Sequence, residues 1–66
     1  MNKKDIDALD RLENSFIHDR EELLSTFAYV QKTEGGFIFR SNWNPALTFE
    51  CTSIAEMKRF ISALNF

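Results

Sequence analysis

The chain has little of what usually reinforces a small domain. Its 66 residues include one cysteine, Cys51, so no intrachain disulfide can form, and one histidine, His18, so the two cannot supply the four ligands of a structural zinc site. A domain of this size buries only about 60% of the surface that its unfolded chain exposes. Seven phenylalanines, one tyrosine and one tryptophan are therefore expected to build a dense core, with a second copy of the chain as a further source of stability.

Positive charge is not in excess, and long apolar runs are missing. Eight Lys and Arg against ten Asp and Glu give a net charge of −2, which is not the balance expected of a protein that binds duplex nucleic acid. No run approaches the ~20 apolar residues of a membrane span, and no signal-peptide pattern follows Met1. With a free thiol as well, the sequence predicts a complete, single-domain cytoplasmic protein over residues 1–66, without membrane contact.

Glycine and proline are also absent from residues 1–34, where the apolar residues recur at roughly helical spacing. These residues are Ile6, Leu9, Leu12, Phe16, Leu23 and Phe27. The pattern predicts one helix from Lys3 to Leu24. The alternative is a break at Asn14–His18 between two helices, because Asp19 to Glu22 has the pattern of a helix start.

Gly35-Gly36 separates two runs typical of strands, "FAYVQKT" and "FIFRSNW", and predicts a hairpin. A two-residue Gly35-Gly36 loop would place Lys32 opposite Phe39. A three-residue loop from Glu34 to Gly36 keeps the aromatic residues on one face, so it is the predicted loop. Its register pairs Thr33 with Phe37, Gln31 with Phe39, Tyr29 with Ser41 and Phe27 with Trp43.

A third strand, Leu47 to Thr52, is predicted after the Asn44-Pro45 turn. Pairing Phe39 with Phe49 places Ser41 opposite Leu47 and Phe37 opposite Cys51. One sheet face then holds Phe27, Tyr29, Phe37, Phe39, Leu47, Phe49 and Cys51. The other holds Lys32, Arg40, Asn42, Thr48, Glu50 and Thr52, with Val30 and Ile38 among them. This alternation is typical of an antiparallel sheet with one solvated face.

The last segment predicts a helix, since Ser53-x-x-Glu56 is a capping box and an apolar stripe follows it. The stripe is Ile54, Met57, Ile61 and Leu64, broadened by Phe60. The predicted fold is therefore α+β: an N-terminal helix, a three-stranded antiparallel β-meander and a C-terminal helix, with both helices packed on one sheet face.

No catalytic, cofactor or metal site is predicted. Cys51 has the parity of the aromatic face, where a cysteine behaves as a small apolar residue, and His18 lies in a charged run of the first helix. Glu34-Gly35-Gly36 lacks the lysine and the following helix of a phosphate-binding loop.

The residues expected to bind a partner are Trp43, Arg40, Val30, Ile38, Lys32, Asp10 and Glu13. Val30 and Ile38 are apolar on the predicted polar face and would form an interface patch if they joined Trp43 or Phe66. Trp43 is predicted at the rim, with its ring closing the core and its N–H reaching water or a partner.

The charged candidates fall into two groups. Asp10 and Glu13 belong to an acidic surface of the first helix that could steer a basic partner. Arg40 and Lys32 are basic, and Glu50 is expected to pair diagonally with Arg40.

The sequence thus predicts a small non-catalytic regulatory protein that acts through protein–protein contacts as a homodimer. By class, such compact acidic proteins are often inhibitors of larger complexes, including those that handle nucleic acid. The alternative is a single-stranded nucleic-acid-binding module that uses basic and aromatic residues of the sheet.

Overall fold

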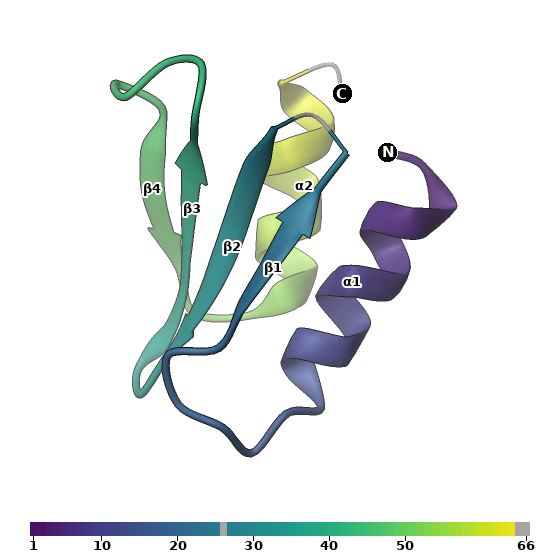
Figure 1. The fold of residues 1–66 in the computed structure, drawn as a ribbon, viewed down its shortest axis with the longest axis vertical. Coiled ribbons are helices and arrows are strands. Elements are labelled where there is room, and N and C mark those ends of the chain that lie inside the picture. Colours follow the sequence, from purple (N-terminus) through teal and green to yellow (C-terminus); the bar gives the residue numbers. More distant parts are fainter. Residues whose placement is uncertain (26, 65–66) are drawn as a thin grey trace.

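The protein is described here by a computed structural model, which covers residues 1–25 and 27–64. Its elements are α1 (Lys3–Glu13), β1 (Glu21–Leu24), β2 (Ala28–Thr33), β3 (Gly36–Ser41), β4 (Thr48–Cys51) and α2 (Ile54–Ala63). The strands form one antiparallel sheet in the order β1-β2-β3-β4, and both helices cover the same side of it (Figure 1). The predicted α+β class and helix–sheet–helix order are confirmed, but the sheet has four strands instead of three.

Helix α1 ends at Glu13, so the prediction of a helix to Leu24 was wrong in its second half. Asn2 caps its start, because the side-chain Oδ1 accepts the N–H of Asp5 at 2.9 Å. At the other end, the backbone N–H and the side-chain amide of Asn14 both donate to the carbonyl of Asp10, at 3.1 and 2.9 Å. The alternative break at Asn14–His18 is present, but a strand follows it instead of a second helix.

Strand β1 is made of residues that the sequence assigned to the helix. Leu24 faces the helices and is buried, whereas Leu23 faces the other way and is 67% exposed. Leucine and glutamate are good helix formers, so local propensity favoured the wrong element. Pairing with β2, which sets Leu24 opposite Ala28, overrides that propensity.

The hairpin between β2 and β3 has a two-residue loop, Glu34-Gly35, so the predicted three-residue loop was wrong. Thr33 pairs with Gly36, and Val30, not Gln31, pairs with Phe39. Shifting the register by one residue exchanges the two faces of β2. Ala28 and Val30 therefore point to the helices, and Tyr29 points away from them.

Gly36 begins β3 where the backbone of a neighbouring strand comes close. A Cβ atom on Gly36 would lie 2.3 Å from the carbonyl oxygen of Cys51. Only a residue without a side chain fits there, so this glycine belongs to the sheet and not to the loop.

The second half of the chain follows the prediction more closely. Phe37 pairs with Cys51 and Phe39 with Phe49, as expected. Ser53 caps α2, because its Oγ accepts the N–H of Glu56 at 3.2 Å. The core lies between the sheet and the helices and consists of Ala8, Leu9, Leu12, Leu24, Ala28, Val30, Phe37, Phe39, Cys51, Ile54, Met57 and Ile61.

Two polar ties hold α1 and its flanking segments to the sheet. The buried carboxylate of Asp5 accepts the backbone N–H of Ser25 at 2.8 Å and its hydroxyl at 3.0 Å. The ammonium group of Lys32 donates to the carbonyl of Glu13 at 3.2 Å and to that of Ser15. Lys32 therefore satisfies carbonyl oxygens at and just beyond the C-terminal end of α1, where a cation also suits the helix dipole.

Candidate functional site

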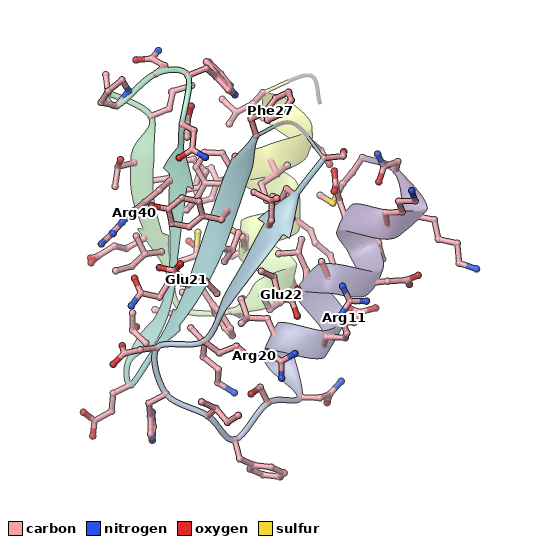
Figure 2. All side chains as sticks on the ribbon, viewed as in Figure 1. Arg11, Arg20, Glu21, Glu22, Phe27 and Arg40 are labelled. Carbon is pink, nitrogen blue, oxygen red and sulfur yellow. The ribbon has the colours of Figure 1, made fainter. Side chains whose placement is uncertain are left out.

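No part of the chain that the structure describes covers the side of the sheet that faces away from the helices. Alternation along the four strands places ten residues there: Glu21, Leu23, Tyr29, Gln31, Ile38, Arg40, Thr48 and Glu50 in two full rows, and the pair Thr33 and Gly36 beside the hairpin loop. We call this surface the open sheet face. Figure 2 shows the side chains of Glu21 and Arg40 on this side, whereas that of Glu22 points toward Arg11 of α1.

The strand register arranges the open sheet face in two rows. One row contains Leu23, Tyr29, Arg40 and Thr48, each opposite the next across neighbouring strands. The other contains Glu21, Gln31, Ile38 and Glu50 in the same strand order. Leu23, Tyr29 and Ile38 thus form an apolar band across three strands, set among charged and amide groups.

Phe27 lies at the end of the sheet, in the turn between β1 and β2 (Figure 2). It has a positive φ of 59° and its side chain is 73% exposed. A left-handed backbone is costly for a bulky residue, and exposure of a phenyl ring gains no burial energy. Burial among the described residues therefore gives little reason for a phenylalanine at this position.

Trp43 belongs to the same end of the sheet. The backbone N–H of the preceding residue, Asn42, donates to the carbonyl of Phe27 at 3.0 Å, which joins the two turns. Ser41 fixes the start of the connection to β4, since its hydroxyl accepts the N–H groups of Trp43 at 3.2 Å and Asn44 at 2.9 Å. Trp43 is 51% exposed, so an ordered loop holds a half-exposed aromatic side chain at this end of the sheet.

Three of the predicted partner-binding residues lie on or beside this surface. Ile38 and Arg40 belong to it, and Trp43 lies at its end. The predicted pair of Arg40 with Glu50 is not formed, since the ion pairs among the described residues join other side chains. Phe66, named as a further member of the patch, lies outside the described residues.

The predicted placement of Val30 and Lys32 on the solvated sheet face was wrong because the register of β2 is shifted. Val30 is fully buried at 0% exposure, under the helices. Lys32 points to the helix side and binds carbonyl oxygens beside α1, so it does not share a face with Arg40. Both errors came from the rule that all aromatic residues of the hairpin share one face.

The acidic candidates on α1 lie away from the open sheet face. Asp10 forms an ion pair with Lys58 of α2 at 2.8 Å, which ties the two helices together. Glu13 is exposed at the end of α1. Neither adds to the charge of the open sheet face.

A second charged group lies between α1 and β1. The carboxylate of Glu22 accepts from Arg11 at 3.3 Å and from Arg20 at 3.2 Å (Figure 2). The hollow beside them is also lined by Asp7 and Asp10. The carboxylates offset both guanidinium groups, so this arrangement is suited to holding β1 against α1 and not to binding an anion.

An exposed apolar pair, Phe16 and Ile17, lies in the segment between α1 and β1. Phe16 is 98% exposed. The sequence assigned it to the buried stripe of a long helix, so its exposure could not be predicted once that helix had been assumed. The segment is held by Ser15, whose hydroxyl accepts the N–H of Ile17 at 3.1 Å.

The nucleophile and base considered from the sequence do not meet. Cys51 is buried on β4, and burial, with a smaller contribution from the Glu56 carboxylate, raises the pKa of its thiol. His18 is exposed in the segment before β1, which is the opposite edge of the sheet. Over residues 1–25 and 27–64, acidic, histidine and cysteine side chains form no group of three that could hold a metal ion.

The helices of the described chain are too short and too polar to cross a membrane. Comparison of the chain with family models, with curated proteins and with solved structures gave no match.

Proposed function

We propose that this is a small regulatory protein of the cytoplasm that binds another protein chain through the open sheet face. The observation that carries the proposal is Leu23. It is 67% exposed in the middle of an ordered strand, beside Tyr29 and in the same apolar band as Ile38. A band of this kind, flanked by charges, is typical of an interface.

Phe27 and Trp43 support the proposal because interfaces draw their binding energy from a few aromatic anchors. Phe27 is exposed although its backbone is strained, and unusual backbone conformations gather where function maintains them. Both rings lie at the end of the face, so a partner that covers Leu23 can also reach them.

The charges favour a protein partner over single-stranded nucleic acid. Lys32 points to the other side of the sheet, which leaves Arg40 as the basic residue of the open sheet face against the carboxylates of Glu21 and Glu50. A strand-binding groove needs positive charge along its length. Nucleic acid stays the second candidate, because Tyr29 and the exposed Trp43 can stack on bases, and it predicts binding that falls steeply with salt. That the protein partner belongs to a nucleic-acid-handling complex is a further expectation from size and acidity.

The proposal is tested by photo-crosslinking in the native host. A photoreactive amino acid in place of Leu23 should give a discrete crosslinked protein. The same photoreactive amino acid in place of Asp7, which is exposed on α1, should not. Ile38→Lys in the position-23 variant should remove the product, because it places an ammonium group in the apolar band. Ile38 is only partly buried, so unfolding midpoints should show that this second variant is folded.

Equal crosslinking from positions 23 and 7, or a product that survives Ile38→Lys, would contradict a role for the open sheet face. Salt-sensitive retention on single-stranded oligonucleotides, lost in Arg40→Gln, would instead favour the second candidate.

A further inference from the structure

The open sheet face carries unpaired charges of both signs. Among the described residues Arg40 has no ion-pair partner, and the same holds for Glu21 and Glu50. Arg40 and Glu21 are two strands apart, on β3 and β1, in different rows. Their separation prevents them from neutralising each other within one chain, but not between two chains.

A two-fold axis can exchange the positions of these two residues. If the axis lies in the plane of contact, passes over β2 between Tyr29 and Gln31, and is perpendicular to the line from Arg40 to Glu21, it relates the positions of these two residues. Arg40 of each copy then lies over Glu21 of the partner subunit, which makes two ion pairs from one kind of contact. Leu23 and Tyr29, which lie beside the axis, meet their own counterparts.

We propose that a second copy of this chain covers the open sheet face, paired through Arg40 and Glu21 about this axis. The inference rests on the proposed function, because it names the protein that the face binds. Its support is charge self-complementarity: the same surface offers a cation and an anion at positions related by the axis, and an apolar band between them.

The size of the face sets the strength of the dimer. Two strands of six residues and two of four, about 4.8 Å apart, give a footprint of roughly 330 Å² per copy. Stable interfaces bury about 800 Å² per partner, so this dimer belongs to the weak, reversible class. We expect a dissociation constant on the order of 10–100 µM.

Charge exchange tests the pairing. Arg40→Glu places two acidic residues at each ion-pair position of a homodimer, and Glu21→Arg places two basic residues there. Each variant alone should self-associate about tenfold more weakly than the wild type or worse. An equimolar mixture of the two should form a 1:1 dimer, because every opposed pair then has opposite charges. Sedimentation equilibrium up to about 1 mM measures all three cases.

Glu50→Arg is the matched control, since it makes the same charge change on the same face but at the edge strand β4. Glu50 takes no part in the Arg40–Glu21 pairs, so the dimer of this variant should match the wild type within about threefold. The double variant Arg40→Glu with Glu21→Arg carries both changes in each copy, so each ion pair forms again between the copies with its signs reversed, and this variant should dimerise like the wild type.

Each possible result supports or contradicts the dimer. A wild-type monomer at the highest concentration, or a dimer that neither single exchange weakens, would overturn the inference. If the wild type is monomeric while position 23 still crosslinks to a different protein in cells, the proposed function stands and the inference about a second copy is wrong. If both signals are absent, both are wrong.

Discussion

At the scale of single residues, Gly36 allows β3 and β4 to pair closely beside the central hairpin. Its missing side chain leaves room for the carbonyl of Cys51 on the neighbouring strand β4. Gly35, one residue earlier, has nothing within 4 Å of the position where a Cβ would lie. The two neighbouring glycines therefore have different roles.

Gly36→Ala should lower the free energy of unfolding by about 2 kcal/mol or more, because the methyl group forces β3 and β4 apart. Gly35→Ala makes the same chemical change in open space and should shift it by less than about 0.5 kcal/mol. Urea unfolding of both variants measures the difference. Equal losses would show that the close approach to Cys51 does not constrain the hairpin.

At the scale of elements, the tie between α1 and the turn after β1 depends on Asp5. Its buried carboxylate binds two donors of Ser25, and Asn2 donates to the same hydroxyl at 2.8 Å. The contact joins residues far apart in the sequence, so it fixes the start of α1 against the end of β1.

Asp5→Ala should destabilise the protein by about 1–3 kcal/mol, since it removes two hydrogen bonds that Ser25 donates to a buried carboxylate. Asp7→Ala removes a carboxylate from the same helix at an exposed position and should have little effect. Thermal or urea unfolding of the two variants gives the comparison. Similar midpoints for both would contradict a structural role for the Asp5 tie.

Elements with strong local signals were predicted from the sequence. The capping box and stripe of α2, and the pairing of Phe37 and Phe39 with β4, are confirmed. Strand β1 was not predicted, because its four residues have helical propensity and become a strand only by pairing with β2. The four residues of β1 do not by themselves indicate that they will pair with β2.

The candidate surface was predicted in part for the same reason. Ile38 and Arg40 were placed correctly because the register of β3 with β4 was right. Val30 and Lys32 were misplaced by the one-residue shift in β2. Leu23 was missed because periodicity treated it as a buried residue of a long helix, and Phe27 because strand parity placed it on the buried face of the sheet.

At the scale of the whole molecule, the buried thiol links stability to pH. Burial, and secondarily the Glu56 carboxylate, raise the pKa of Cys51 above its ordinary value of 9.0. As pH rises past 9.0, the unfolded chain loses this proton first, so the unfolded state is favoured until the folded thiol also ionises. The contribution of Cys51 is thus fully present below the ordinary thiol pKa and is lost above it.

We compare the free energy of unfolding of the wild type with that of Cys51→Ala. The difference between the two should be constant near neutral pH and should decrease toward about pH 10, by at most 1.36 kcal/mol per pH unit. Urea unfolding across this range measures it, and comparison with the alanine variant cancels the titration of lysines and tyrosine. A constant difference over the whole range would mean that Cys51 titrates alike in both states.

The strand order has a kinetic consequence. Because β1, β2, β3 and β4 are neighbours both in the chain and in the sheet, most of the sheet can form by closing short loops one after another. In a sheet assembled from such local contacts, closing each loop costs little chain entropy before the strands pair. We therefore expect folding on a timescale on the order of milliseconds. The chain can therefore finish folding as a monomer before it meets a second copy, and its rate of folding should not depend on protein concentration.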